Sequence, residues 1–468
     1  MEKCTPHGKP SSRLIRSRPE AAKLLAHSLA DKEVSYRLEV LSEHADLYLV
    51  GGMVRDAFLG CELKDLDLAM SLTPDKAMSL LEEKSVRAIG TGIEHGTITI
   101  PAGDHSIEFT TFRKPSSRHQ TEYGTSIEED LSGRDFTINA IAFDPFKEEF
   151  IDPFDGIKHI EEGVLKAVGD PKERFLEDPL RMLRMIRFGP AQGRTVDTET
   201  FSVVGELAES LKSVSVERIR EELLRILSSE FPHEGIRALL DTRLLPVVIP
   251  ELVPSVGMEQ NEWHFHDVFE HTLWVLERSE DDLLLRVACL LHDIGKPDTL
   301  TVDEDGNRHF YNHEHVGAEM AEQFLARLKF SKKDTKVVTS LVKHHMRPLD
   351  CGPAGVRRIM RDLGEEFDRW LLIKRADAPP VMPEEEFEQL YGEFLELVKS
   401  ERERLAGPAY GKLALSGADL LQLGYSEGPH IGEALSRCED AVIEDPEKNN
   451  RDTLLKIAKE CLVENSAS

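Results

Sequence analysis

Residues 49–56 read Leu-Val-Gly-Gly-Met-Val-Arg-Asp, and residues 65–67 read Asp-Leu-Asp. The first stretch predicts an apolar strand, a glycine turn and a short helix, since glycine allows close backbone approach and a helix N-terminus favours phosphate. Residues two apart in a strand share a face, so Asp65 and Asp67 are expected side by side. Mg²⁺ binds such carboxylates together with substrate phosphates. The combination predicts two-metal phosphoryl or nucleotidyl transfer, whereas an isolated Asp-x-Asp is more often a solvated strand end or turn.

The length of the chain allows several domains. Its 468 residues predict about three or four domains, and a hydrophobic content of 40% is ample for packed cores. No apolar run reaches the roughly 18 residues that a membrane span needs, and no secretory signal is visible. The six cysteines are scattered without a paired spacing. We therefore expect a cytoplasmic protein with no membrane partner and no cysteine zinc site.

The charge balance is strongly acidic. Lys and Arg number 58 against 86 Asp and Glu, which gives a formal net charge of −28. Such a charge by itself disfavours a nucleic-acid partner. An RNA-binding function therefore needs local basic patches, because binding depends on where the charges lie.

Hydrophobic periodicity divides the chain into an α/β part and a helical remainder. Strand-like runs occur at 47–50, 66–69, 97–100 and 107–111. From about residue 171, apolar residues recur at helical spacings. The predicted fold class is an α+β head with a mixed sheet and helices, followed by an all-helical neck, a further helical domain and a helical tail. The expected domains are an N-terminal tail or helix at 1–30, the head at 31–168, the neck at 169–250, the further helical domain at 258–378 and the tail at 381–468.

Three further motifs follow the glycine turn. They read Gly-Arg-Asp-Phe-Thr-Ile-Asn-Ala at 133–140, Ile-Asp-Pro-Phe-Asp-Gly at 151–156 and Glu-Asp-Pro-Leu-Arg at 177–181. In this order the motifs resemble the class II tRNA nucleotidyltransferase and poly(A) polymerase family, which includes the CCA-adding enzymes. The resemblance covers nearly the whole chain. It implies attack of an RNA 3′-hydroxyl on the α-phosphate of a nucleotide, with pyrophosphate as the leaving group.

The resemblance implies roles for residues of the head. Asp65 and Asp67 match the metal-binding carboxylates of the family, which hold two Mg²⁺ ions. Glu108 stands where a third carboxylate on a neighbouring strand is expected, and an outward-facing strand residue is an equal alternative. The residues implied to contact the triphosphate and sugar of the nucleotide are Gly51, Gly52, Arg55, Arg134, Asp135 and Asn139.

Asp178 and Arg181 are one helical turn apart, so both are expected to face the same way on a helix. Such a pair can read a base edge, because the carboxylate accepts from an exocyclic amine and the guanidinium donates to the adjacent ring nitrogen. Cytosine and adenine both offer this pattern, whereas uracil and guanine do not. The alternative is that Asp178 only caps a helix with Pro179 at its first position.

The region after residue 171 is locally basic. Arg174, Arg184 and Arg187 supply positive charge there, and Arg184 is a candidate contact to a nucleotide phosphate. Arg218 and Glu222, four residues apart, resemble the helix-bracing pair of the family. An ordinary surface pair explains these two residues nearly as well.

Two features depart from the family pattern. Gly133 stands where the family usually has arginine, which removes one phosphate or sugar contact. The segment between Arg113 and Ile127 is several residues shorter than a flexible loop that the family links to the switch from CTP to ATP addition. The short segment favours, as a minority alternative, a specialist that adds only C.

Histidines gather in the second helical domain, where nine of the 18 fall between positions 264 and 345. The set that resembles the metal ligands of the HD phosphohydrolase superfamily consists of His271, His292, Asp293 and Asp377. Imidazole and carboxylate suit a divalent transition metal such as Mn²⁺ or Ni²⁺, although capping or buried histidines are the default for a lone His-Asp pair. Candidates for a second metal position or a phosphate contact are His313, His344 and His345.

The predicted function is addition of C and A to the tRNA 3′ end, with tRNA, CTP and ATP as partners and no obligate protein partner. A CC-adding or A-adding partial enzyme and a poly(A) polymerase are alternatives within the family. A metal-dependent phosphohydrolase acting on RNA ends or nucleotides is an alternative of another class, or an additional activity. A non-catalytic RNA-binding protein is disfavoured by the net charge of −28. Residues 415–432 also resemble the family's tail domain for the tRNA elbow.

Overall fold

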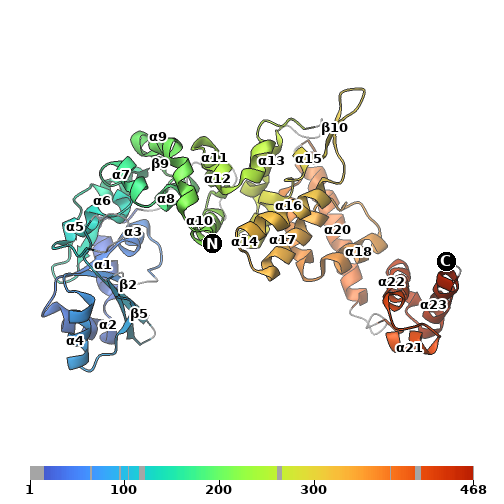
Figure 1. Cartoon of the computed structure of the whole chain (residues 1–468), viewed down its shortest axis with the longest axis horizontal. Helices are drawn as coiled ribbons and strands as arrows, with labels where there is room; N and C mark the ends of the chain where they lie inside the picture. Colours follow the sequence, from blue (N-terminus) through green and yellow to red (C-terminus); the bar gives the residue numbers. More distant parts are fainter. Residues whose placement is uncertain are drawn as a thin grey trace. The chain divides into compact units, whose positions relative to one another are not determined.

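A computed structural model of the chain describes residues 15–63, 66–93, 96–103, 105–114, 122–260, 266–379, 381–405 and 413–466. Asp65 and most of the short segment that follows Arg113 lie outside the described residues. The chain divides into two compact units, Met1–Val253 with Arg327–Lys329, and Pro254–Ala326 with Phe330–Ser468 (Figure 1). Each unit has a hydrophobic core of its own.

A seven-stranded mixed sheet forms the centre of the head. Its strands, in the order β3-β4-β5-β2-β1-β6-β7, are β1 (Leu47–Val50), β2 (Leu66–Met70), β3 (Ile89–Gly92), β4 (Thr97–Ala102), β5 (His105–Thr111), β6 (Ala142–Asp144) and β7 (Glu149–Ile151). Strands β2 and β5 run parallel, and the other neighbours are antiparallel. The prediction of a mixed sheet with strands near 47, 66, 97 and 107 is confirmed.

Alternation along β2 fixes which side chains reach the cavity. Leu66 and Leu68 are buried, and Asp67 between them points to the opposite face. The helices of the head around the sheet are α1 (Arg18–Ser28), α2 (Lys32–Ser42), α3 (Gly52–Leu59), α4 (Pro74–Glu83), α5 (Ile127–Ser132), η2 (Thr137–Asn139) and α6 (Gly156–Glu162). Helix α3 begins directly after β1, as the glycine turn predicts.

The neck is mainly helical, as predicted. Its elements are α7 (Pro171–Glu177), α8 (Leu180–Phe188), η3 (Pro190–Gln192), α9 (Thr198–Leu207), η4 (Ala208–Ser213), α10 (Val216–Leu227), α11 (Pro232–Asp241), α12 (Leu245–Val248) and η5 (Pro250–Ser255). A short parallel ladder between β8 (Val164–Leu165) and β9 (Thr195–Val196) is an addition that the helical pattern does not predict.

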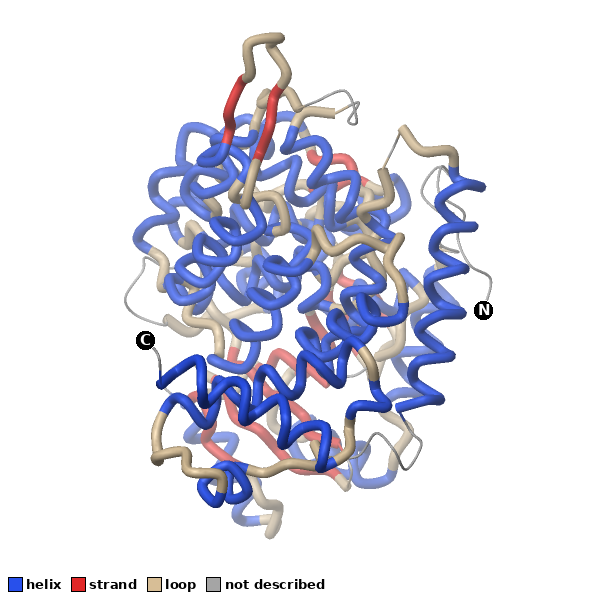
Figure 2. Tube along the Cα trace, turned by 90° about the vertical axis from the view of Figure 1, so that its right-hand side faces the viewer, coloured by secondary structure: helices blue, strands red, loops and turns tan. Residues whose placement is uncertain are grey.

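The second unit is also built mainly of helices. They are α13 (Val268–Arg278), α14 (Leu283–Leu291), α15 (Lys296–Thr299), α16 (His313–Arg327), α17 (Lys332–His344), α18 (Pro353–Leu363), η6 (Gly364–Glu366), α19 (Phe367–Ala376), α20 (Glu384–Leu405), α21 (Gly417–Gln422), α22 (Pro429–Glu444), η8 (Pro446–Lys448) and α23 (Arg451–Ser466). One antiparallel hairpin, β10 (Leu300–Val302) with β11 (Arg308–Phe310), stands out from the helices around it (Figure 2).

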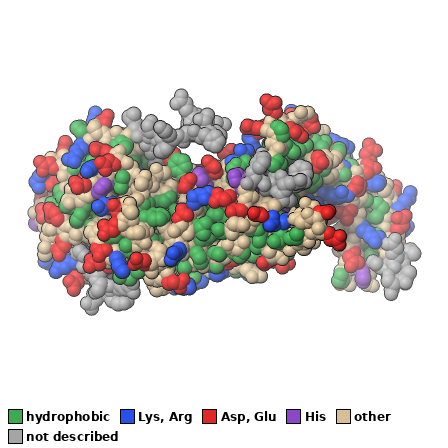
Figure 3. All heavy atoms as spheres, turned by 90° about the horizontal axis from the view of Figure 1, so that it is seen from above, with side chains coloured by type: hydrophobic (Ala, Val, Ile, Leu, Met, Phe, Trp, Pro, Cys, Tyr) green, Lys and Arg blue, Asp and Glu red, His purple; other side chains and the backbone are tan. Residues whose placement is uncertain are grey.

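On the face drawn in Figure 3, Asp and Glu side chains are interspersed with Lys and Arg side chains. Among the helices that the structure describes, none is long and apolar enough to cross a membrane.

Candidate functional site

A cavity of about 720 Å³ in the first unit collects the predicted residues of the head and neck. Every predicted head or neck site residue within the described ranges lines it, namely Gly51, Gly52, Arg55, Asp67, Glu108, Arg134, Asp135, Asn139, Asp178, Arg181 and Arg184. Asp65, the remaining predicted residue, lies outside the described ranges. Residues that are far apart in the sequence thus meet in one cavity.

Two strand carboxylates lie next to each other in this cavity. Asp67 on β2 is the register partner of Glu108 on β5, and neighbouring strands lie about 4.8 Å apart. Glu108 is exposed, as expected for an outward-facing strand residue, and its exposed side chain lines the cavity. Adjacent carboxylates in a cavity that several arginines also line suit a divalent cation.

The glycine turn brings backbone and guanidinium groups together. Gly51 adopts φ +70°, a conformation that side chains rarely take, at the start of α3. A Cβ atom at Gly51 would lie 3.5 Å from Nη1 of Arg134, and a Cβ atom at Gly52 would lie 3.5 Å from Nη2 of Arg55. The turn therefore presents a helix N-terminus beside two cations, which is a suitable place for a phosphate group.

A chain of hydrogen bonds fixes the polar wall of the cavity. Nη1 of Arg55 donates to Oδ1 of Asn139 at 2.7 Å, and Nδ2 of Asn139 donates to Oδ1 of Asp135 at 3.0 Å. Nε of Arg184 donates to the other Asp135 oxygen at 2.7 Å. The chain connects α3, the η2 region and α8, so it ties the head to the neck.

Asp135 stays ionised at the centre of this chain. Burial alone would raise its pKa, but the Arg184 guanidinium and the hydrogen bonds from Asn139 and from the Phe136 backbone N–H hold that pKa below its ordinary value. Because the folded-state pKa is lowered, the stabilisation is present above the unfolded pKa and is lost as the pH falls through the folded pKa.

We therefore predict a pH-dependent stability difference between the wild type and Asp135→Asn. The substitution should cost about 2 kcal/mol of unfolding free energy, with a constant difference from about pH 5 to 8 that shrinks below about pH 4. Urea unfolding followed by circular dichroism measures the difference. All three tryptophans (263, 274 and 370) belong to the second unit, so their fluorescence transition should not move. If the difference in unfolding free energy stays constant down to pH 3, Asp135 is not the ionised group proposed here.

The Ile-Asp-Pro-Phe-Asp-Gly motif has a structural role. The Asp152 carboxylate accepts hydrogen bonds from the backbone N–H groups of Gly156 at 2.6 Å and Ile157 at 2.9 Å. A Cβ atom at Gly156 would lie 2.2 Å from the carbonyl oxygen of Thr137, so glycine is required there. The motif packs α6 against η2 and thereby positions Asn139.

The prediction of one helix across 177–181 is wrong. Asp178 lies between α7 and α8 with φ −143° and ψ 100°, because a residue before proline is pushed toward an extended conformation. Its Oδ1 accepts from the Leu180 backbone N–H at 3.2 Å, which is the predicted capping alternative. Its Oδ2 accepts from Nη2 of Arg218 at 2.8 Å. Asp178 therefore both caps α8 and places its carboxylate in the cavity.

Arg181 and Glu222 have partners other than those expected. Arg181 donates to Oε2 of Glu177 at 2.8 Å and to the carbonyl oxygen of Gly133 at 2.9 Å. Glu222 accepts from Nε of Arg187 at 2.6 Å, whereas Arg218 pairs with Asp178. The expected pairing of Arg218 with Glu222 is thus replaced by two ion pairs, each of which joins α10 to the segment that begins at Asp178.

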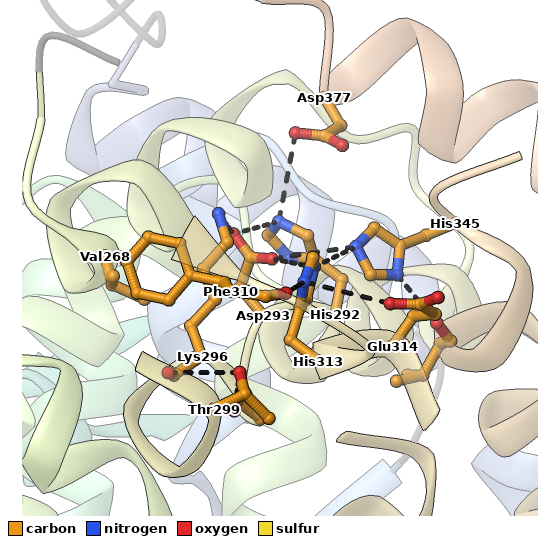
Figure 4. A network of polar contacts seen from close by, with 12 residues as sticks. Val268, His292, Asp293, Lys296, Thr299, Phe310, His313, Glu314, His345 and Asp377 are labelled. Carbon is orange, nitrogen blue, oxygen red and sulfur yellow. Dashed lines mark hydrogen bonds and ion pairs between the residues drawn. The ribbon is translucent and has the colours of Figure 1, made fainter. Parts of the chain in front are cut away.

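The second unit holds a buried cluster of histidines and aspartates (Figure 4). His271 on α13, with His292 and Asp293 after α14, forms one group, and Asp293 with His313 and His345 forms another. Nε2 of His271 also lies 3.0 Å from Oδ1 of Asp377, which follows α19. The structure thus brings together six of the seven candidate ligands of this domain.

The hydrogen bonds of the imidazoles leave their Nε2 atoms for coordination. Nδ1 donates to a backbone carbonyl oxygen at 2.8 Å in His292, at 2.7 Å in His313 and at 2.7 Å in His345. In a neutral imidazole this makes Nε2 an acceptor. Nε2 of His313 nevertheless lies only 3.2 Å from Nε2 of His345. Converging acceptors of this kind are stabilised by a shared cation, so the residues fit a metal.

Asp293 lies between the two groups. Its Oδ2 is 3.1 Å from Nε2 of His292, and its Oδ1 is 3.3 Å from Nε2 of His313. Burial opposes its ionisation, but His292 and Lys296 hold the pKa of Asp293 well below its usual range. Burial also lowers the pKa of His345, which keeps that imidazole neutral and able to coordinate. Asp293 would therefore contribute a ligand to a cation in either group.

His344 does not join this cluster, so the prediction of a metal-ligand role for it is wrong, while the alternative of a phosphate contact stays a prediction. It lines a different surface cavity with His315, Lys336 and Lys343 on α16 and α17. Adjacent residues at a helix end point about 100° apart, so His345 can reach the cluster while His344 turns away.

Three parts of the chain match known families. Residues 47–166 match the Poly A polymerase head domain, residues 193–255 the probable RNA and SrmB-binding site of polymerase A, and residues 264–378 the HD domain. The A-adding tRNA nucleotidyltransferase of Deinococcus radiodurans is 34% identical over 408 residues, which are 84% of this chain and 90% of that protein. The chain belongs to the tRNA nucleotidyltransferase and poly(A) polymerase family.

Other relatives of this nucleotidyltransferase are CCA-adding enzymes. Those of Ligilactobacillus salivarius and Levilactobacillus brevis are 38% identical over 205 residues and 42% identical over 207 residues. Each match covers 42% of this chain and 50% of the relative, so the chain spans about half the length of these two proteins. Enzymes of the family depend on divalent metal ions.

A solved structure supports the same fold. The Bacillus stearothermophilus CCA-adding enzyme in complex with CTP superposes with a TM-score of 0.70 at 25% identity, over 93% of this chain and 99% of that chain. The predicted fold class, a mixed-sheet head followed by a mostly helical body with an HD domain, is thereby confirmed.

Phe188 and Asp130 are among the residues lining the nucleotidyltransferase cavity that the sequence did not predict. Phe188, at the end of α8, lies under the guanidinium groups of Arg187, Arg55 and Arg184, at 3.8, 4.8 and 5.5 Å from its ring centroid. Buried Asp130 accepts from Nη2 of Arg134 at 2.7 Å and holds it in place. For Phe188, the sequence offered one signal, namely that it follows Arg184 by four residues and so shares a helix face with it.

Proposed function

We propose that this nucleotidyltransferase adds C and A nucleotides to the 3′ end of tRNA from CTP and ATP. The observation that carries the proposal is the cavity in which Asp67 and Glu108 share a register position and which several arginines also line. Carboxylates that bind metal and cations that bind triphosphate are the two requirements of nucleotidyl transfer. The A-adding and CCA-adding relatives give the acceptor and the nucleotides.

Different residues of the cavity are assigned to bind the metal ions and the triphosphate. Asp67 and Glu108, with Asp65, are assigned to hold Mg²⁺, and bound Mg²⁺ supplies charge stabilisation at the α-phosphate and lowers the pKa of the attacking hydroxyl. Gly51 and Gly52 let the triphosphate approach the N-terminus of α3. Arg55 and Arg134 neutralise phosphate charge there, and the chain through Asn139, Asp135 and Arg184 keeps that wall rigid.

The base is read at Asp178 and Arg181. In the structure, Arg218 donates to the Asp178 carboxylate, and Arg181 donates to the Glu177 carboxylate. These two partners occupy the hydrogen-bonding groups that would otherwise bind the edge of a base. An incoming cytosine or adenine replaces them, because its amine donates to Asp178 and its ring nitrogen accepts from Arg181. A nucleotide that lacks this pattern leaves the ion pairs in place and is rejected.

Asp178→Asn is predicted to relax this selection. The asparagine still caps α8 but offers both a donor and an acceptor, so uracil gains a partner. The preference for CTP over UTP, as a ratio of kcat/KM, should fall by about 10- to 100-fold. Glu173→Gln, on the exposed side of α7, is the matched control and should keep the wild-type ratio. An unchanged ratio in Asp178→Asn would remove Asp178 from base selection.

Nucleotide addition is tested with two acceptors. tRNA lacking its CCA end and tRNA ending in CC are each incubated with Mg²⁺ and with CTP, ATP or both. The proposal expects CC from CTP alone, CCA from both nucleotides, and A on the CC-ended acceptor. Extension of only one acceptor would identify a CC-adding or A-adding enzyme, and no extension of either would overturn the proposal.

The HD domain supports a second activity, hydrolysis of phosphate esters. The specific observation that favours it is Asp293, whose two oxygens face two separate groups of imidazoles. We assign His271, His292, Asp293 and Asp377 to one divalent metal and Asp293, His313 and His345 to another, and the mixed imidazole and carboxylate donors suit a transition metal such as Mn²⁺ or Ni²⁺. Metals bound there supply a Lewis acid for a phosphate oxygen and an activated water.

A further inference from the structure

The cavity beside the HD metal ligands is large and mostly apolar away from them. It measures about 630 Å³, which is the size of a site for a whole small molecule rather than for a phosphate ion. The ligands His271, Asp293, His313, His345 and Asp377 form one part of its wall. Other parts come from the β11 segment, from Leu349 between α17 and α18, from Val381 and Met382 between α19 and α20, and from Phe387 and Leu390 on α20.

An aromatic pair on the hairpin borders this cavity. Tyr311 is 68% exposed, which is unusual for a large ring, and its ring stacks on that of His309 at 5.3 Å between centroids and 10° between planes. Both rings line the cavity. One face of Tyr311 is covered by His309, and the ring offers a flat apolar surface for a second planar group.

The aromatic pair is held rigid although its hairpin stands out from the helices (Figure 2). Nε2 of His309 donates to Oδ2 of Asp303 at 2.9 Å, and the backbone N–H of Asn307 donates to the other oxygen at 2.8 Å. The His309 side chain and these backbone groups lower the pKa of Asp303 to about 2, so the carboxylate keeps its charge and its hold on His309. A fixed ring loses little entropy when a ligand stacks on it.

A lysine lies on the metal side of the same cavity. Lys374 on α19 lines it three residues before Asp377, and its Nζ donates to the carbonyl oxygen of His345 at 3.1 Å. An ammonium group in this place is positioned for an anion bound at the metal ligands.

We propose that this cavity binds a nucleoside phosphate, with the phosphate held by the metal centre and Lys374 and the base stacked on the Tyr311–His309 pair. The inference rests on the metal centre proposed above and adds what selects its ligand. Base stacking on an aromatic ring is tolerant of base identity, so any nucleoside phosphate is accepted and inorganic phosphate is bound more weakly. Tyr311 is thus the residue that distinguishes a nucleotide from a phosphate ion.

The test uses the full-length protein loaded with Mn²⁺ and read by tryptophan fluorescence. All three tryptophans lie in the second unit and Trp274 stacks on the metal ligand His271, so binding in the head cavity is silent. The probes are adenosine 3′-monophosphate and inorganic phosphate. The nucleotide should bind about tenfold or more tightly than phosphate.

Variants separate the two halves of the proposal. Tyr311→Ala should weaken the nucleotide by about tenfold and leave phosphate unchanged, while Tyr311→Phe should keep the wild-type affinity. Lys374→Met should weaken both probes. Matched controls are Val302→Ala, exposed on the same hairpin, and Arg375→Gln, the exposed neighbour of Lys374; both should bind as the wild type does.

The outcomes distinguish this inference from the metal centre itself. If Mn²⁺ titration produces no saturable binding, the metal centre fails and the inference falls with it. If Mn²⁺ and phosphate bind but adenosine 3′-monophosphate binds no more tightly than phosphate, the inference alone is overturned. An equal loss of both probes in Tyr311→Ala would also overturn it.

Discussion

Asp67→Asn should lower the rate of nucleotide addition by about 10³-fold, with little change in unfolding free energy. Asp67 and Glu108 are paired across two parallel strands in the cavity, and an amide at position 67 removes the charge that holds the metal. A loss of this size corresponds to about 4 kcal/mol of transition-state stabilisation, a reasonable share for a metal that acts as a Lewis acid. Single-turnover addition of CMP to truncated tRNA measures the effect.

The control for Asp67→Asn is a carboxylate on the same sheet but outside the cavity. Glu149 on β7 is exposed and does not line the site, so Glu149→Gln should add nucleotides at the wild-type rate. If Asp67→Asn stays within tenfold of the wild type, the metal assignment on β2 is wrong.

Asp293→Asn should remove metal from the HD domain and abolish any phosphate-ester hydrolysis there. The two Asp293 oxygens face different imidazole groups, so one substitution affects both metal positions. The variant also leaves Lys296, which lies 2.6 Å from Oδ2, beside a neutral group, so some loss of stability is expected as well. Bound Mn²⁺ or Ni²⁺ per chain, measured by elemental analysis after gel filtration, gives the readout.

His344→Ala is the matched control, because His344 precedes a proposed ligand but lines a different cavity. It should retain the full metal content. Nucleotide addition should be unchanged in Asp293→Asn, since Asp293 lies outside the nucleotidyltransferase cavity. Full metal content in Asp293→Asn would contradict the assignment of Asp293 to both metal positions.

The positions of the site residues were predictable where a local rule placed them. Alternation in β2 put Asp67 on one face, and the glycine pair predicted both the turn and the helix after it. The order of motifs then connected Arg134, Asp135 and Asn139 to the same cavity, since each lies in a motif that the family resemblance covers.

The interactions between distant segments were not predictable in this way. The bond from Arg218 to Asp178 spans 40 residues, and the one from Arg184 to Asp135 spans 49, so no sequence period reports them. The helix expected across 177–181 failed because Pro179 acts locally on Asp178. The three-residue strands β6 and β7 are too short for alternation to be visible.

In the HD domain, too, some site residues were predictable from the sequence and others were not. The order of His271, His292, Asp293 and Asp377, which resembles that of the HD superfamily, indicated a metal site, but adjacent His344 and His345 could not be distinguished without the direction of α17. The hairpin that carries Tyr311 was not predicted, because its strands have only three residues each and its side chains are largely exposed.

Sequencing of tRNA 3′ ends is the most direct measurement of the proposed activity. Truncated tRNA that lacks only its 3′-terminal CCA is incubated with the protein, Mg²⁺ and all four nucleoside triphosphates. We expect products that end in CCA and then stop, with U and G almost absent. Unchanged 3′ ends, or tails of mixed or repeated nucleotides, would contradict template-independent addition of C and A by the Asp67–Asp178 cavity.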